Sequence, residues 1–119
     1  MTHPAFARLD AAGCPALDAA ALEGFAAGPG LRVLLVAGDP AKRPEAVDAA
    51  VILVELLKAY PVAAARAAPA AEAAAQSRFG AAVLPCLVFL RDGTPVGKLP
   101  GVKDWDAYRA AFDAHLATA

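Results

Sequence analysis

The sequence has little of the chemistry that small enzymes commonly use. Its two cysteines, Cys14 and Cys86, are far apart and form no Cys-x-x-Cys pair. Its two histidines, His3 and His115, lie near opposite ends without metal-ligand spacing, and we expect both side chains to be exposed. No Ser/His/Asp set and no phosphate-binding glycine loop is present. We therefore expect no metal site and no cofactor.

Long apolar runs and a strong charge of either sign are also missing. No apolar segment approaches the ~18 residues of a membrane span, so we expect no membrane insertion. The first residues show neither the basic nor the apolar region of a secretory signal. The formal net charge is −1, which gives no reason to expect nucleic acid as a partner. We predict a cytoplasmic protein, in which both cysteines are reduced.

The length and the apolar content predict one globular domain over residues 1–119. Two continuous apolar runs, Leu31–Ala37 and Leu87–Leu90, are typical of strands buried on both faces. Asp92-Gly93 after the second run predicts a two-residue turn, because both of its positions tolerate positive φ. The return strand is Val96–Leu99, and Pro95 places it at a sheet edge.

Capping residues and periodicity predict the other elements. Asp18 is expected to cap a helix over residues 19–27, and Pro44 to begin a long helix that ends near Ala59. Further elements are expected as short strands at Phe6–Leu9 and Val62–Ala67, a short helix over residues 69–77 closed near Gly80, and a helix over residues 103–117 capped by Asp104. In that last helix an aromatic stripe is expected to face the core, formed by Trp105, Tyr108, Phe112 and Leu116.

The long helix has two different faces. Its broad apolar face consists of Ala46, Ala49, Ala50, Leu53, Val54, Leu56 and Leu57. The opposite side carries an acidic stripe, which we define as Glu45, Asp48 and Glu55 with Ile52 set among them. Such a stripe can be a simple solvated face or a binding surface for cations.

Together these elements resemble the thioredoxin fold. In that fold a cis-proline precedes the fourth strand, and Leu84-Pro85 stands at this place. The fold class we predict is α/β, a thioredoxin-like three-layer α/β/α sandwich with a mixed central sheet. The redox motif CGPC would fall on residues 43–46, which here are Arg-Pro-Glu-Ala. Dithiol exchange needs two thiols at those positions, so the sequence argues against an oxidoreductase of that kind.

Cys86 keeps one alternative open, a monothiol redox enzyme or sensor. It follows the expected cis-proline and would lie near the vacated redox position. A thiol there would be reactive if its pKa were lowered by Arg43 or by the helix N-terminus. The favoured interpretation is that Cys86 is a small buried core residue, as free cysteine often is.

The segment from Leu31 to Tyr108 resembles the HyaE/HupG (HoxO) family of hydrogenase expression proteins, which have a thioredoxin-like fold without the Cys-x-x-Cys pair. The residues that carry this resemblance are Asp39-Pro40 with Pro44-Glu45, Asp48, Glu55-Leu56-Leu57, Arg78-Phe79-Gly80, and Gly101 with Trp105. The resemblance implies a non-catalytic maturation chaperone for nickel–iron (NiFe) hydrogenase. It implies binding of the small-subunit precursor through its twin-arginine signal peptide before export, with other hydrogenase accessory proteins as further partners.

The residues themselves offer two surfaces for such a peptide. The acidic stripe, extended by Asp39 on the preceding loop, presents carboxylates for guanidinium groups beside the apolar Ile52. An exposed cleft at Leu84-Pro85, left by the missing dithiol, is the second candidate groove. A structural subunit of a larger assembly is a further interpretation of a thioredoxin-like domain without chemistry.

Overall fold

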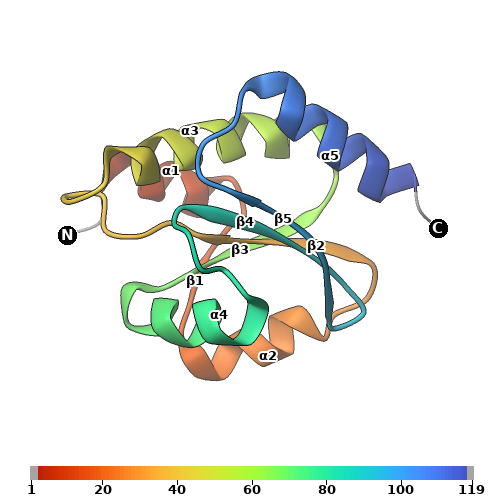
Figure 1. Ribbon diagram of the computed structural model, residues 1–119, viewed down its shortest axis with the longest axis horizontal. Coiled ribbons are helices and arrows are strands. Elements are labelled where there is room, and N and C mark those ends of the chain that lie inside the picture. Colours follow the sequence, from red (N-terminus) through yellow and green to blue (C-terminus); the bar gives the residue numbers. More distant parts are fainter. Residues whose placement is uncertain (1–2, 118–119) are drawn as a thin grey trace.

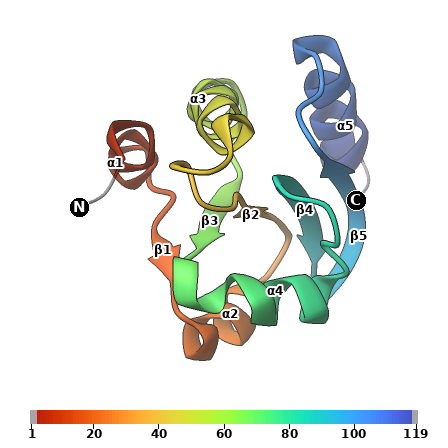
Figure 2. The ribbon, with the colours of Figure 1, turned by 60° about the vertical axis from the view of Figure 1, so that its left-hand side comes forward.

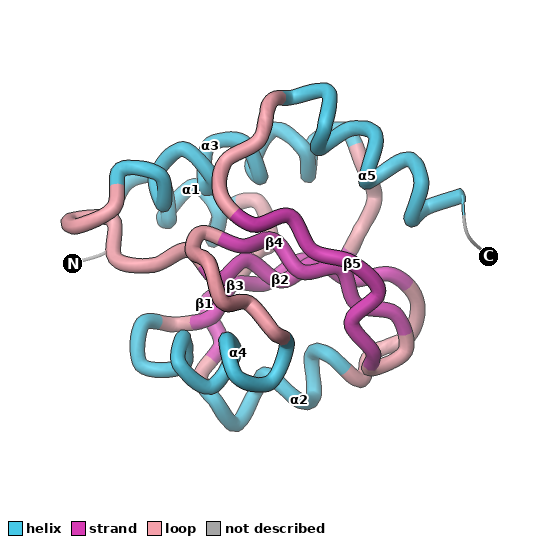
Figure 3. The backbone as a smooth tube through the Cα atoms, in the orientation of Figure 1, coloured by secondary structure: helices cyan, strands magenta, loops and turns pink. Residues whose placement is uncertain are grey.

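The computed structural model describes residues 3–117, which form a five-stranded sheet between two layers of helices (Figures 1 and 3). The elements in chain order are α1 (Pro4–Ala11), β1 (Ala16–Leu17), α2 (Ala19–Ala26), β2 (Leu31–Val36), α3 (Pro44–Ala59), β3 (Ala63–Ala67), the 3-10 turn η1 (Pro69–Ala71), α4 (Glu72–Phe79), β4 (Cys86–Arg91), β5 (Thr94–Pro100) and α5 (Trp105–Ala117). Helices α1, α3 and α5 cover one face of the sheet, and α2 and α4 cover the other (Figure 2).

The sheet is mixed, as predicted, with the strand order β1-β3-β2-β4-β5. Strands β1, β3 and β2 are parallel, whereas β4 is antiparallel to β2 and β5 is antiparallel to β4. The two predicted buried runs are therefore neighbours at the centre, where Leu34 lies opposite Val88. Each central strand needs apolar side chains on both sides, which explains why neither run shows alternation.

Strand alternation divides the core into two clusters. Val33, Leu35, Leu87 and Phe89 point to the α1, α3 and α5 layer, which we call the α3 face of the sheet. Leu34, Val36, Cys86, Val88 and Leu90 point to the α2 and α4 layer, which we call the α4 face. Cys86 therefore faces away from α3, the helix whose start would carry a redox dithiol.

Several local predictions are confirmed by the geometry. Asp18 Oδ1 accepts a hydrogen bond of 2.8 Å from Ala21 N, and Asp104 Oδ1 accepts one of 2.8 Å from Ala107 N. Asp92 and Gly93 have φ values of 51° and 87°, as the hairpin turn requires. The Leu84-Pro85 peptide bond is cis.

The prediction of a strand at Phe6–Leu9 is wrong, since these residues lie in α1. Pro4 stands in the first turn and His3 Nδ1 accepts a hydrogen bond of 3.1 Å from Ala5 N, so the segment has a helix start. Ala5 and Leu9, four residues apart, are buried on the same face of the helix. The first strand comes later, at Ala16–Leu17.

The ends of α5 also differ from expectation. Tyr108 and Phe112 are buried as predicted, but Trp105 is 41% exposed and Leu116 is 39% exposed. His115 is half-buried rather than exposed, because its ring stacks on Phe89 with 4.4 Å between the ring centroids. Within residues 3–117, none of the helices has the length and apolar character to cross a bilayer.

Candidate binding site between α3 and α5

The start of α3 carries no nucleophile. Arg43 is its N-cap residue and Ala46 is fully buried, so the two positions that would hold a dithiol offer a guanidinium and a methyl group. The Arg43 side chain lies over Gly38, where an added Cβ would come within 2.8 Å of Arg43 Cδ. Gly38 also has a φ of 91°, so glycine is required there for two reasons.

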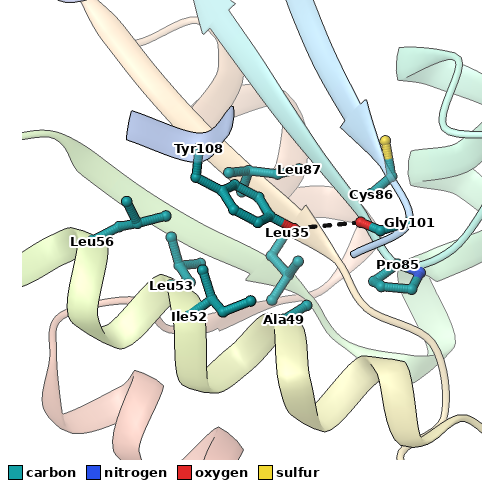
Figure 4. Close-up of a pocket in the computed structure, with 10 residues that line it drawn as sticks. All are labelled: Leu35, Ala49, Ile52, Leu53, Leu56, Pro85, Cys86, Leu87, Gly101 and Tyr108. Atoms are coloured by element: carbon teal, nitrogen blue, oxygen red, sulfur yellow. Dashed lines mark hydrogen bonds between the residues drawn. The ribbon is translucent and has the colours of Figure 1, made fainter. Parts of the chain in front are cut away.

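Cys86 does not have the environment that the monothiol alternative needs. Its side chain is 1% exposed and packs in the core of the α4 face. Figure 4 shows the sulfur pointing away from the α3 side chains. Burial raises the pKa of the Cys86 thiol, and the positive charge of Lys98 opposes this only in part. The lowered pKa on which the monothiol alternative depends is therefore not found, and Cys86 is a buried core residue, as the favoured interpretation has it.

Cys14 is a core residue too. It is fully buried, and this burial raises its pKa to about 12, although the Arg66 guanidinium acts in the opposite direction. Arg66 is itself held by Asp10 at 2.6 Å and by the carbonyl of Cys14 at 3.0 Å. Both cysteines are free thiols.

A narrow apolar cleft lies between α3 and α5, and we call it the α3–α5 cleft (Figure 4). Its lining residues are Leu35, Ala49, Ile52, Leu53, Leu56, Pro85, Cys86, Leu87, Gly101 and Tyr108. Cys86 borders the cleft although its sulfur points away from the α3 side chains. Its enclosed volume is about 10 Å³, enough for a single water molecule. The cleft can therefore accept a side chain at its mouth, but it cannot enclose a ligand.

Tyr108 fastens the loop that forms one side of this cleft. Its hydroxyl donates to the carbonyl of Gly101 at 3.4 Å (Figure 4). It also accepts from the amide of Lys103 at 3.3 Å. Burial raises the pKa of Tyr108, so the hydroxyl stays protonated and available as a donor at neutral pH. Tyr108 thus holds the segment between β5 and α5 in place through a hydroxyl that carries no charge.

A cleft is present near Leu84-Pro85, as predicted, but it is the narrow α3–α5 cleft and the proline is not exposed in it. Pro85 is fully buried at the floor of the α3–α5 cleft, and its carbonyl accepts a hydrogen bond of 2.7 Å from Gly101 N. Leu84 is half-buried and packs against the core of the α4 face. The neighbouring Val83 is 58% exposed.

The acidic stripe meets the α3–α5 cleft at Ile52, and Glu45 and Asp48 each lie one helical turn before a cleft residue, Ala49 and Ile52 respectively. Glu45, Asp48 and Glu55 are exposed, while Ile52 is half-buried and lines the cleft. Glu55 pairs with Lys58 at 3.0 Å and also borders a hollow between α1 and α3 that contains Arg8. Within residues 3–117, neither Glu45 nor Asp48 makes an ion pair. Two carboxylates of the stripe are thus open to a cation, and the third is already partly neutralised.

Asp39 lies in a separate hollow. Its carboxylate accepts a hydrogen bond of 2.9 Å from Ala41 N, and the hollow also contains Phe6 and Glu72. Glu72 Oε2 accepts a hydrogen bond of 2.8 Å from Gly38 N. Burial raises the pKa of Glu72; that hydrogen bond opposes the rise and the charge of Asp39 adds to it. Sequence reasoning missed Glu72, whose only signal was an acidic residue at the start of a helix.

Two exposed apolar side chains lie close in sequence to the cleft residues Gly101 and Tyr108. Val102 is 39% exposed and Trp105 is 41% exposed, and Trp105 lies one helical turn before the cleft residue Tyr108. The aromatic stripe in the sequence therefore includes both a core part and a surface part. Sequence reasoning missed Trp105 as a surface residue because its spacing matches that of the buried Tyr108 and Phe112.

The mixed sheet, the cis-proline before β4 and an α3 start without thiols define a thioredoxin-like protein that lacks the redox dithiol. A mutant thioredoxin from Halobacterium salinarum superposes with a TM-score of 0.73 at 17% identity, covering 89% of this chain and 92% of that one. The profile of the family described as "Hydrogenase-1 expression protein HyaE" matches residues 6–108, so the chain belongs to this family.

Individual relatives agree with the family match. The "Hydrogenase expression/formation protein HoxO" of Azotobacter vinelandii is 45% identical over 119 residues, which cover 98% of this chain and 80% of that protein. The crystal structure of a putative hydrogenase expression/formation protein HupG from Rhodopseudomonas palustris has a TM-score of 0.59 at 36% identity, covering 87% of this chain and 95% of that one. The predicted fold and the predicted family are both confirmed.

Proposed function

We propose that this protein is a non-catalytic chaperone of NiFe hydrogenase maturation. Its relatives are named as hydrogenase expression or formation proteins, which supports a role in producing that enzyme. The vacated dithiol position and the two buried thiols support an accessory role rather than catalysis. The protein would act in the cytoplasm, together with other hydrogenase accessory proteins.

The ligand we propose is the twin-arginine signal peptide of the small-subunit precursor, bound before export. The observation that carries this proposal is the pair of exposed carboxylates, Glu45 and Asp48, each one helical turn before a residue that lines the apolar α3–α5 cleft. A guanidinium can bind a carboxylate through two parallel hydrogen bonds, which an ammonium cannot do. A site built in this way should therefore prefer arginine to lysine.

The exposure of these carboxylates also predicts how binding responds to salt. Charges at a solvated rim increase the association rate and the selectivity more than the affinity. Their effect weakens as ionic strength rises, because the Debye length is about 10 Å at 0.1 M salt. Peptide binding should therefore become weaker, but should not vanish, at high salt.

The test is calorimetric titration of the purified protein with a synthetic twin-arginine signal peptide at low and high salt. The matched control is the same peptide with both arginines replaced by lysine. We expect salt-sensitive binding that is several-fold tighter for the arginine peptide. Equal affinity for the two peptides, or no binding to either, would overturn the proposed ligand.

A further inference from the structure

A hollow of about 430 Å³ lies beyond the carboxyl ends of the neighbouring parallel strands β2 and β3, and we call it the β2–β3 hollow. The chain after β2 continues into α3, whereas the chain after β3 continues through η1 into α4. Because α3 and α4 cover opposite faces of the sheet, the two connections separate at this point (Figure 2). Ligands of open α/β sheets bind in the crevice at such a point. The topology therefore marks the β2–β3 hollow as a candidate binding site.

The walls of this hollow combine apolar rings with two carboxylates. Phe6 of α1 and the prolines Pro40 and Pro69 form the apolar part, and Asp39 and Glu72 supply the carboxylates. The volume lies within the range of about 300–1,000 Å³ that is usual for small-ligand sites, and so does this kind of lining. The β2–β3 hollow can therefore hold a ligand group that the narrow α3–α5 cleft cannot enclose.

Each carboxylate has one oxygen that is held by the backbone and one oxygen that is open. Glu72 Oε2 accepts a hydrogen bond of 2.8 Å from Gly38 N, and Asp39 Oδ1 accepts one of 2.9 Å from Ala41 N. The other oxygen of each group accepts no hydrogen bond from residues 3–117. The backbone thus orients two acceptors in one hollow, which suits a cation that carries several N–H groups.

The neighbouring cations leave these two negative charges largely uncompensated. Across the part of the chain that the structure describes, neither Asp39 nor Glu72 forms an ion pair, and neither Lys42 nor Arg43 lines the hollow. Burial raises the pKa of Glu72, and the charge of Asp39 raises it by more than the charge of Arg43 lowers it. Arg66 is paired with a carboxylate of α1 at 2.6 Å. A cation that enters the hollow therefore relieves the repulsion between its two carboxylates.

We propose that the β2–β3 hollow binds a guanidinium group on an apolar stem, as in an arginine side chain or a small arginine-like molecule. The planar guanidinium has N–H donors at fixed angles, so it can bond to both open carboxylate oxygens at once. It also stacks on aromatic rings, which suits Phe6, while the stem contacts the proline rings. The ammonium of lysine is more strongly hydrated and fits this arrangement less well. The site is separate from the acidic stripe and does not depend on the ligand proposed above.

The test is a titration of the folded protein followed through its backbone amide resonances by NMR. The ligand is N-acetyl-arginine methylamide, which has a guanidinium and no terminal charges, and the matched control is its lysine analogue. We expect saturable shifts at Gly38 and Ala41, because both amides donate to the carboxylates that bind the guanidinium. The lysine analogue should bind several-fold more weakly. Shifts without saturation, equal affinities for the two compounds, or shifts confined to Glu45 and Asp48 would overturn the proposal.

A pair of variants tests the carboxylate. Glu72→Gln removes the charge but keeps an oxygen that can accept from Gly38 N, and it should weaken binding of the arginine compound about ten-fold or more. Asp106→Asn is the matched control, because Asp106 is exposed, lies outside the hollow and forms no ion pair within residues 3–117. It should leave the affinity unchanged, and the amide spectra show whether each variant is folded. Equal affinities for the two variants would overturn the proposal.

The twin-arginine peptide then distinguishes the two sources of the guanidinium. If the peptide also shifts Gly38 and binds Glu72→Gln more weakly, the hollow takes an arginine side chain of that peptide. If only the small arginine compound does so, the hollow takes a different arginine-like ligand. Both results support the site. Absence of peptide binding in calorimetry would overturn the proposed ligand of the preceding section alone, because the small compound carries no signal-peptide sequence.

Discussion

The two faces of the sheet use similar side chains for different purposes. On the α4 face, Cys86, Val88 and Leu90 are closed in by α2 and α4, and each is at most 1% exposed. On the α3 face, the neighbouring residues Pro85 and Leu87 line the cleft between α3 and α5. A shift of one residue along β4 thus separates a sealed core from the base of the α3–α5 cleft. The Cys86 sulfur and the surface proposed for peptide binding are therefore on opposite sides of the sheet.

The strongest test of this comparison is thiol accessibility. Both thiols are buried and have raised pKa values, so at pH 7 to 8 the reactive thiolate is scarce and shielded. Alkylation must then wait for opening of the fold, which slows it by at least about a thousand-fold relative to the unfolded chain. Mass spectrometry after iodoacetamide treatment, with and without urea, measures this. Rapid labelling of Cys86 in the native protein would show that the α4 face is open.

The next largest effect is expected from a cavity on the α4 face. Leu34 is fully buried there, and Leu34→Ala should destabilise the protein by about 2–5 kcal/mol. Urea denaturation gives the stability, and calorimetry with the folded variant gives peptide affinity. Stability should fall while affinity is unchanged, because Leu34 points away from the cleft. A parallel loss of affinity would show that the two faces are coupled.

Charge reversal on the α3 face should have the opposite profile. The double variant Glu45→Lys with Asp48→Lys should weaken binding of the twin-arginine peptide more than ten-fold, while stability changes by only about 0.5 kcal/mol, as is usual at exposed sites. Glu55→Lys is the control from the same stripe. Its effect should be smaller, since Glu55 already pairs with Lys58 at 3.0 Å. Equal losses in the two variants would contradict the division of the stripe.

The parts of the fold that were predictable are those set by local rules. Continuous apolar runs identified β2 and β4, and caps identified the starts of α2 and α5. Four residues, Phe6–Leu9, are too few to distinguish the two-residue period of a strand from the 3.6-residue period of a helix. Pro4 in the first turn and the contact with α3 determine that this segment is helical. Local signals of that length are overridden by packing.

In the candidate site, the arrangement of residues along one helix was predictable, whereas contacts between different segments were not. The position of Ile52 among three acidic residues follows from helix geometry alone. The partner of Glu55, the burial of Pro85 and the exposure of Trp105 depend on which segment lies opposite, and the sequence does not contain that information locally. The side of the sheet that Cys86 faces required the register of β4 against β2.

The smallest expected effect concerns the far end of α5 on the α3 face. Burial against Phe89, and secondarily the charge of Arg91, lowers the pKa of His115. The unfolded chain therefore binds a proton more readily than the folded chain, so stability falls as the pH drops below the unperturbed value of about 6.5. Gln cannot titrate, so His115→Gln should remove this part of the pH dependence.

Urea midpoints for both proteins at about pH 7.5 and pH 5.5, on either side of that unperturbed pKa, measure the difference. Other groups titrate in both proteins and cancel in the comparison. The parent protein should lose slightly more stability on acidification than the variant. Equal losses would show that His115 is as accessible to protons in the folded chain as in the unfolded one. Stacking on Phe89 would then not shield the imidazole, and the packing of α5 on the α3 face would end before His115.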